Sequence, residues 1–385
     1  MAAVQIIPTK FYGVWDRGYE PEFQNNTDYD YLLGVRANIK WRDLQPTGPN
    51  DYDWTMIQTI LNDSYTHNRM VKLSIFVGPD APSWIYSNGV PSVTTDSEKH
   101  TGMAQYPYYL NAKYKELFFE VIKQFGNFLR NQPQHLFDLI AYVQVMTGCT
   151  GDEIPYKGNP SPIQYDISEA EWTIFRLESF EQFRVHFNEG DTNKIALLFN
   201  QIDPKKQETE LKWILRYVTH GFGVKGGGFV RGHHLADELS FKVKWTPYLL
   251  NPQGLQLFSC EEMDQTWTRP LYQINVALNF YWGALNGLNT GLSIWDVSKT
   301  ALEEAQKIPE IHNVFRFFNR YAGQIYPSTA VAAFSIFHEG LNSENTTKFP
   351  ESIYGRKQKP NLERYLEICK AYSDKGANMD DVYAA

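Results

Sequence analysis

Two acidic positions stand out because each follows a strand-like apolar run. The run LIAYVQVM (139–146) leads into TGCTGDEIPYKG, which places Glu153 shortly after the run ends. The run LQLFSCEE (255–262) finishes in the adjacent acids Glu261 and Glu262. Two carboxylic acids flanking a glycosidic bond can cleave it: one protonates the leaving oxygen, and the other attacks the anomeric carbon or activates water. The sequence therefore predicts paired-acid hydrolysis of a glycoside, provided that the fold brings these acids together.

Alternation along the second run favours one of its two acids. Side chains of a strand point to opposite faces in turn, and Leu255 and Leu257 are expected to face surrounding helices. Glu261 then shares their face, and Glu262 points to the other face as the predicted nucleophile. Glu261 is the runner-up, because a β-bulge would reverse the parity.

The elements that must position these acids alternate between strands and helices. Apolar residues at helical spacing predict helices over 114–132 and 208–221. Eight strand-like runs, most of them followed by a helical pattern, predict a (β/α)₈ TIM barrel over residues 1–325. These runs cover 10–16, 32–39, 71–78, 139–146, 194–201, 221–228, 255–260 and 290–297.

The pattern restarts after the predicted barrel. STAVAAFSIFHEGL reads as a further strand, and NLERYLEICKAYSDKGA reads as an amphipathic helix. A barrel has no place for a ninth strand, so residues 326–385 are expected to be the start of a second α/β module or a C-terminal extension.

Chemistry in such barrels takes place at the carboxyl ends of the strands. Nearly every predicted strand ends in a group that could bind or react. Across the barrel mouth, the fourth strand faces the seventh, which would set Glu153 and Glu262 on either side of one bond. The other candidate substrate-binding residues at these ends are Trp15, Arg17, Arg36, Lys40, Trp84, Asp152, Asn200, Lys225, His233 and Trp295.

Four stretches resemble the clan of retaining (β/α)₈ glycoside hydrolases that contains the family 42 β-galactosidases. They are GVRANIKWRDLQPTGPNDYDW (34–54), LSIFVGPDAPSW (73–84), GCTGDE (148–153) and EEMDQTW (261–267), the last of which adds Trp267 to the candidate binding residues. The resemblance extends over about residues 10–325. It implies an acid/base at Glu153 and a nucleophile at Glu262. It also implies that Arg36 holds the nucleophile's carboxylate, and that Trp295 lies under the reacting sugar.

One position departs from the clan's pattern. Clan members usually carry an asparagine just before the acid/base, where it binds the 2-hydroxyl of the sugar, but this chain has Asp152. The motif TGDE followed by YKG is more similar to relatives that degrade marine galactans, such as the family 167 carrageenases. This similarity implies a galactan substrate with β-galactosidic bonds.

Basic residues near the strand ends point to an anionic substrate. Although the net charge is −8, cations recur at these ends, and guanidinium groups bind sulfate or carboxylate in a bidentate manner. A sulfated galactan of the carrageenan type is therefore the expected substrate. The alternatives are neutral galactosides, as in a β-galactosidase or an agarase, and pairing of each cation with a nearby acid. The cations are Arg17, Arg36, Lys40, Lys157, Lys225 and Arg231.

The composition of the chain argues against several classes of binding partner. The acidic balance argues against nucleic acid, and the sequence has no apolar stretch of membrane-spanning length. The three cysteines fit neither a disulfide framework nor a zinc site, so no cofactor is expected. Aromatic residues make up 15% of the chain, a surplus that suits stacking on sugar rings. A secreted or periplasmic location is expected, with the leader absent from this chain, and a homo-oligomer is compatible with the sequence.

Two other functions stay open. A metal-dependent barrel hydrolase could draw ligands from RGHHLADEL, with His233, His234 and Asp237 or Glu238. Loss of activity with a chelator would favour it. A non-catalytic polysaccharide-binding protein would bind glycan without releasing reducing ends.

Overall fold

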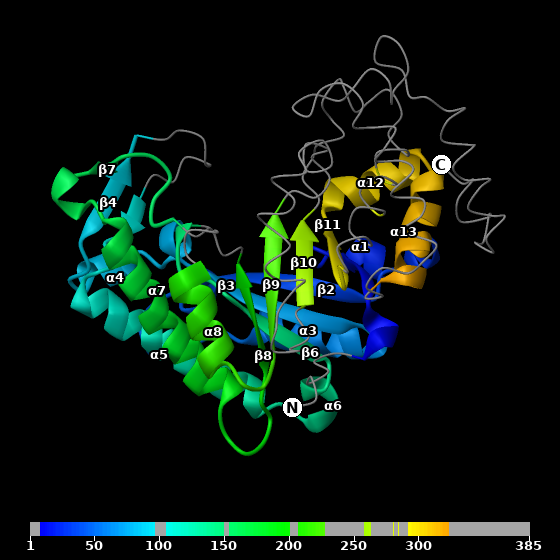
Figure 1. Ribbon diagram of the computed structural model, residues 1–385, viewed down its shortest axis with the longest axis horizontal. Coiled ribbons are helices and arrows are strands. Elements are labelled where there is room, and N and C mark those ends of the chain that lie inside the picture. The colour runs from blue at the N-terminus through cyan, green and yellow to red at the C-terminus, as the bar shows by residue number, and fades with distance from the viewer. Residues whose placement is uncertain are drawn as a thin grey trace, which may run out of the picture. The chain divides into compact units, whose positions relative to one another are not determined.

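The computed structural model describes residues 8–96, 105–149, 154–200, 207–227, 258–262, 280, 284 and 292–322 (Figure 1). Strands occur at all eight predicted positions: β1 (Gly13–Asp16), β2 (Gly34–Lys40), β3 (Met70–Phe76), β6 (Ile140–Val145), β8 (Ala196–Asn200), β9 (Phe222–Gly227), β10 (Phe258–Glu262) and β11 (Ile294–Val297). Their hydrogen-bonded order, β1-β11-β10-β9-β8-β6-β3-β2, is the closed order of a barrel. The predicted α/β class is confirmed. Residues 326–385 lie outside the described residues, so the second module stays a prediction.

Contacts group the described chain into two compact units. Unit A comprises the described residues of 8–35 and 225–322, and unit B comprises those of 36–224. The chain passes between the units within two strands, because β2 begins in unit A and β9 begins in unit B.

Strands β3, β6 and β8 form the core of unit B. The parallel register of β6 and β8 pairs Tyr142 with Ala196 and Val145 with Phe199, and β6 is buried along its whole length. A strand that is covered on both faces needs apolar side chains on both. This requirement explains why its sequence is a continuous apolar run rather than an alternation.

Helices cover this core, and α5 and α7 lie side by side (Figure 1). The α-helices of unit B are α2 (Trp41–Leu44), α3 (Thr55–Thr66), α4 (Trp84–Ser87), α5 (Ala112–Arg130), α6 (Gln134–Phe137), α7 (Glu169–Phe183) and α8 (Lys212–Tyr217). π-Helical turns span Arg184–Asn188 and Gln207–Leu211, and a 3₁₀ turn spans Ile163–Tyr165. The prediction over 114–132 is confirmed by α5. The helix expected over 208–221 is shorter, because the chain turns extended at Val218.

The two long helices begin at side-chain caps. At α5, the side chain of Asn111 accepts hydrogen bonds from the backbone N–H groups of Lys113 and Tyr114. At α7, Ser168 and Glu171 form a reciprocal capping box. Such caps satisfy N–H groups that a helix leaves unpaired, and each contributes about 1 kcal/mol.

A small antiparallel sheet, which the sequence analysis does not anticipate, lies beside this core. Its strands are β4 (Ser92–Thr95), β5 (Gln105–Pro107) and β7 (Pro160–Ser161), in the order β5-β4-β7. Thr94 pairs with Gln105 and Ser161. The strands are too short for a clear period-two pattern, and β7 comes from a segment distant in the sequence. The sheet joins the segment after β3 to the segment after β6.

Unit A is built around β1, β10 and β11, with α13 (Glu310–Tyr321) packed on β1. Asn319 of α13 accepts a hydrogen bond from Val14 N–H at 2.7 Å and donates to the Tyr31 carbonyl at 2.7 Å. The indole of Trp15 occupies the space that a Cβ at Gly34 would need, so β2 can approach β1 only with glycine there. The remaining elements are α1 (Pro21–Gln24), α12 (Lys299–Lys307) and the 3₁₀ turns Thr9–Phe11 and Thr27–Tyr29.

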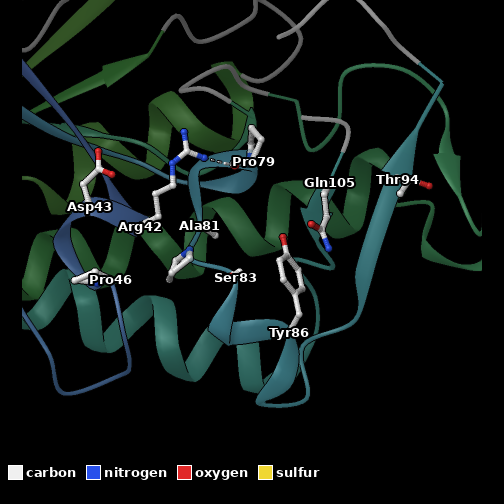
Figure 2. A pocket seen from close by; sticks show the side chains of 10 residues that line it. Arg42, Asp43, Pro46, Pro79, Ala81, Ser83, Tyr86, Thr94 and Gln105 are labelled. Carbon is white, nitrogen blue, oxygen red and sulfur yellow. Dashed lines mark hydrogen bonds between the residues drawn. The ribbon is translucent and has the colours of Figure 1, made fainter. Parts of the chain in front are cut away.

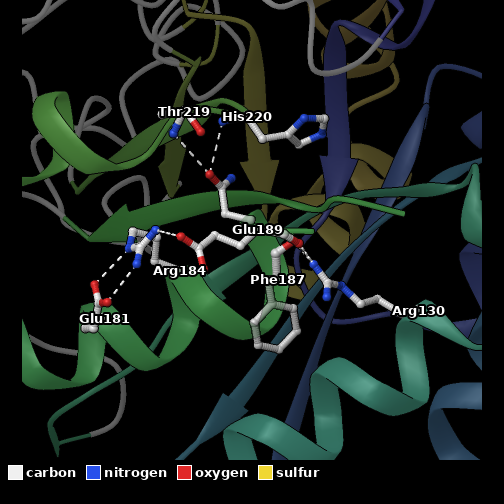
Figure 3. A network of polar contacts seen from close by, with 8 residues as sticks. Arg130, Glu181, Arg184, Phe187, Glu189, Thr219 and His220 are labelled. Atoms are coloured by element: carbon white, nitrogen blue, oxygen red, sulfur yellow. Dashed lines mark hydrogen bonds and ion pairs between the residues drawn. The ribbon is translucent and has the colours of Figure 1, made fainter. Parts of the chain in front are cut away.

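A polar network lies just ahead of β8 and β9 in unit B (Figure 3). Buried Asn188 donates to the carbonyls of Ile195 and Gly221 at 3.2 and 3.4 Å. Its Oδ1 accepts from the N–H groups of Thr219 and His220 at 3.1 and 3.0 Å. One side chain thus satisfies four backbone groups at the amino ends of two strands.

Charged groups border this network (Figure 3). Arg184 pairs with both Glu181 and Glu189, and Arg130 donates to the Glu189 carbonyl. These contacts fix the turn that connects α7 to β8.

Replacing Asn188 with alanine is expected to lower the free energy of unfolding by about 3 kcal/mol, because buried backbone groups lose their partners. Urea denaturation measures the loss. The control is Asn62→Ala, at an exposed position of α3, where the change should stay within about 0.5 kcal/mol. Activity per folded molecule should not change, since the amino ends of barrel strands serve stability. An equal loss of stability in both variants would contradict the role of Asn188 in satisfying buried backbone groups.

Candidate active site

Strand β2 carries two predicted binding residues in different environments. Arg36 is buried within the strand, and Lys40 closes the strand with an exposed side chain. A guanidinium inside a strand must be oriented by polar neighbours. The position of Arg36 thus suits a residue that holds another group in place, and Lys40 suits direct contact with a solute.

Beyond β2 and β3, a salt bridge ties two strand-end segments together. Arg42 Nη2 lies 2.9 Å from Asp80 Oδ1, and Arg42 Nη1 donates to the Pro79 carbonyl at 3.3 Å. Burial raises the pKa of the Asp80 carboxyl, and the positive charges of Arg42 and Lys40 oppose that rise. The nearby Trp84 is half-buried and donates its indole N–H to the Gln45 carbonyl at 2.7 Å.

Asn200, the last residue of β8, is another predicted binding residue. It is buried and accepts a hydrogen bond from the Gln144 side chain of β6. Its Nδ2 lies 3.8 Å from the sulfur of Met146. The structure thus brings together polar side chains from neighbouring strands, as the barrel prediction requires.

The segment that carries the predicted acid is bracketed by a backbone hydrogen bond. The N–H of Cys149 donates to the carbonyl of Ile154 at 3.1 Å. Asp152 and Glu153 fall between these two residues and lie outside the described residues. Their predicted roles therefore stay predictions.

A buried ion pair lies next to the chain that leads from β6 into that segment. Arg176 of α7 and Glu210 make two parallel hydrogen bonds of 2.9 Å. A further nitrogen of Arg176 lies 3.5 Å from the hydroxyl of Thr147, just after β6. Both partners are almost fully buried, with side chains 2% and 0% exposed. The pair therefore links α7, the turn before α8 and the end of β6.

In unit A, β1 ends in an acid that organises the following loop. Asp16 accepts hydrogen bonds from Gly18 N–H, Glu20 N–H and the Gln24 side chain at 2.7–2.9 Å. Burial raises its pKa to about 6 despite these bonds. The adjacent Arg17 is half-buried, so the loop presents that residue rather than Asp16 to solvent.

Two tryptophans predicted to bind sugar lie in the core. Trp15 is 0% exposed and donates its N–H to the Phe11 carbonyl at 3.0 Å. Trp295 is 1% exposed and packs edge-on against Phe315 and Phe318 of α13. Both indole rings are covered by neighbouring groups, so we assign them packing roles and place neither in the site proposed below.

The two adjacent acids lie in β10, which pairs with β11 in a parallel register. Glu261 pairs with Trp295 and Glu262 pairs with Asp296. The ring of Trp295 packs on Phe318 of α13. Glu262 is the last residue of β10. The choice of Glu262 over Glu261 as the nucleophile therefore stays a prediction.

Of three further predicted binding residues, the structure describes only Lys225. Lys225 lies within β9 and is half-buried. His233 and Trp267 lie outside the described residues, as do the histidine ligands of the alternative metal site. Among the residues that the structure does describe, no group of three or more histidine, cysteine or acidic side chains could hold a metal ion.

A cavity of about 670 Å³ opens beside the Arg42–Asp80 salt bridge in unit B (Figure 2). Its walls come from α2, the turn after β3, α4 and the small sheet. Tyr86 and Gln105 line it, and neither is among the residues predicted from the sequence. The motif GPDAPSW indicated this region, but no local pattern indicates that Gln105 returns to it through β5.

Within the described chain, no helix has both the length and the apolar character that a bilayer crossing requires.

Comparison with known proteins identifies the fold. No protein-family model matches the chain, and no curated protein matches it. Among solved structures, the catalytic domain of β-amylase from Paenibacillus polymyxa is similar at a TM-score of 0.55 and 8% identity, covering 82% of this chain and 99% of that one. A trimodular endoglucanase of glycoside hydrolase subfamily 5_4 is similar at a TM-score of 0.54 and 10% identity, covering 82% of this chain. The chain has a (β/α)₈ barrel fold.

The match to the endoglucanase covers 61% of that protein's length. Xylanase 10B from Thermotoga maritima is also similar, at a TM-score of 0.48 and 12% identity, covering 77% of this chain and 86% of that one. At these identities the likeness concerns the fold, and the chemistry must be argued from this chain's own residues.

Proposed function

We propose that this protein is a retaining glycoside hydrolase that acts on a polysaccharide or its oligosaccharides. The observation that carries the proposal is the strand order. β6 and β10 are the fourth and seventh strands of the barrel, and acidic residues follow the one and end the other. The proteins similar in fold bear names of glycoside-cleaving enzymes, a β-amylase and an endoglucanase, which supports the same class of reaction.

In the proposed mechanism, Glu153 donates a proton to the glycosidic oxygen while Glu262 attacks the anomeric carbon. Water then hydrolyses the glycosyl-enzyme, with Glu153 acting as base. Retention requires carboxyl groups about 5–5.5 Å apart. The acid must be protonated while the nucleophile is ionised, so their surroundings must move the two pKa values apart.

The proposed substrate is a galactan with β-galactosidic bonds, sulfated as in carrageenan. Its support is the similarity of the TGDE–YKG segment to galactan-degrading relatives, together with the cations near the strand ends. Lys40 is exposed and Arg17, Lys157 and Lys225 are half-buried, so these groups reach solvent. Neutral galactosides are the second candidate, favoured by the pairing of Arg42 with Asp80.

A substrate screen tests the class of reaction. Purified protein is incubated with agar, carrageenans and simple β-galactosides, and the anomer released first is identified by NMR. A retained β-anomer is expected. An inverted product would refute the two-step mechanism, and glycan binding without any cleavage would favour the non-catalytic alternative.

Replacing Glu153 with glutamine is expected to lower kcat on a galactan oligosaccharide by about 10²- to 10⁴-fold, the contribution of general acid catalysis. The loss in the first step should be far smaller on a dinitrophenyl galactoside, whose leaving group needs no proton. Pre-steady-state release of dinitrophenol separates that step from hydrolysis of the glycosyl-enzyme.

The matched control is Glu169→Gln, which alters an exposed acid at the start of α7. It should leave both rates unchanged. Equal losses on the two substrates in Glu153→Gln would contradict the role of Glu153 as a proton donor.

A further inference from the structure

The cavity in unit B is lined by both apolar and polar groups. A sugar likewise presents apolar C–H faces and polar hydroxyls. Three of its lining residues are prolines that follow strand ends: Pro46, Pro79 and Pro82. Proline rings offer flat C–H surfaces without hydrogen-bonding groups of their own. Its volume of about 670 Å³ lies within the range of about 300–1,000 Å³ that is usual for ligand sites.

The charges at the cavity largely compensate one another. The guanidinium of Arg42 is paired with Asp80 at 2.9 Å and also donates to the Pro79 carbonyl. The exposed Asp43 adds a carboxylate to the lining. A sulfate here would face that carboxylate and an arginine whose charge is already balanced. The cavity therefore favours a neutral ligand over an anion.

Hydrogen-bonding capacity remains on the opposite wall. Among the described residues, the hydroxyl of Tyr86 has no hydrogen-bond partner, and Figure 2 shows it on the same side of the cavity as Gln105. Gln105 donates through Nε2 to Ser92 Oγ at 2.8 Å, which orients the amide and keeps its oxygen as an acceptor. A hydroxyl and an amide oxygen together suit the paired hydroxyls of a pyranose.

We propose that this cavity is a carbohydrate subsite that binds a neutral sugar unit of the glycan. The proline surfaces contact the C–H face of the sugar, and Tyr86 and Gln105 bind its hydroxyls. The inference rests on the proposed function for its class of ligand, but it concerns binding and stands apart from the paired acids. A neutral unit here is compatible with sulfate on other units of the same chain.

Isothermal titration calorimetry tests the subsite. The protein carries Glu262→Gln to prevent turnover, and the probes are a neutral agarose-derived tetrasaccharide and a sulfated κ-carrageenan tetrasaccharide. Tyr86→Phe keeps the ring and removes only the hydroxyl, so a threefold to tenfold rise in Kd for the neutral probe is expected, the loss of about one neutral hydrogen bond. Tyr86→Phe combined with Gln105→Ala should raise Kd by about 10- to 50-fold.

The control is Tyr65→Phe, which removes an exposed hydroxyl on α3, away from the cavity lining. It should leave Kd unchanged, and circular dichroism verifies that each variant is folded. An unchanged Kd in the Tyr86 variants overturns the proposal. So does tighter binding of the sulfated probe that depends on Tyr86, or failure of both probes to bind. Hydrolysis of galactans by the wild type, measured separately, shows whether the proposed function itself fails.

Discussion

Replacing Glu262 with glutamine is expected to reduce kcat by about 10⁴-fold or more, the scale of loss when a covalent nucleophile is removed. Glu262 ends β10, in register with Asp296 of β11. Steady-state hydrolysis of a galactan oligosaccharide measures the loss. Binding of the substrate should persist, because the amide keeps the size of the carboxylate.

The neighbouring acid provides a matched control for this prediction. Glu261→Gln removes the same charge one residue earlier, in register with Trp295, and should leave kcat close to that of the wild type. Labelling with a 2-deoxy-2-fluoro galactosyl fluoride followed by peptide mass spectrometry identifies the attacked carboxylate directly. A label on Glu261 would show that the runner-up is the nucleophile.

Replacing Glu210 with glutamine is expected to lower the free energy of unfolding by about 3–5 kcal/mol, because it leaves the charge of Arg176 buried without its partner. Arg176 and Glu210 are 2% and 0% exposed, so water cannot replace the lost carboxylate. Urea denaturation followed by circular dichroism measures the change. The control is Glu116→Gln, whose carboxylate is 66% exposed and pairs with Lys113; there the change should be about 0–1 kcal/mol.

A double substitution separates the charge from the packing at this pair. Methionine at both Arg176 and Glu210 removes the two charges together and fills similar volume, so it should be less destabilising than Glu210→Gln alone. A double variant as unstable as the single one would show that shape, and not the unpaired charge, dominates. The double variant should also have a lower kcat, because Arg176 lies close to Thr147, which follows β6.

The local pattern of apolar residues was sufficient to predict the positions of the barrel strands. The eight runs expected from composition and spacing coincide with β1, β2, β3, β6, β8, β9, β10 and β11. A strand that is buried on both faces needs a nearly continuous apolar run, which is a property of the segment alone. The helix over Ala112–Arg130 could be predicted for the same reason, since its apolar spacing is local.

Long-range packing decided what the sequence analysis missed. β7 is only two residues long and joins β4 from a distant segment, so no window around it indicates a strand. Trp295 lies near the end of a predicted strand, but its ring is packed on Phe315 and Phe318. Whether an aromatic residue faces a ligand or a helix depends on the elements beside it, and those lie elsewhere in the chain.

By itself, the sequence determined the type and order of the barrel elements and the two strands that carry acids, because these follow from local hydrophobic period and residue type. Only the tertiary structure decided that Arg42 is neutralised by Asp80, that Asp16 binds its own loop, and that Tyr86 and Gln105 line one cavity. Charge pairing, burial and the shape of a cavity depend on distances between residues far apart in the chain, and folding sets those distances.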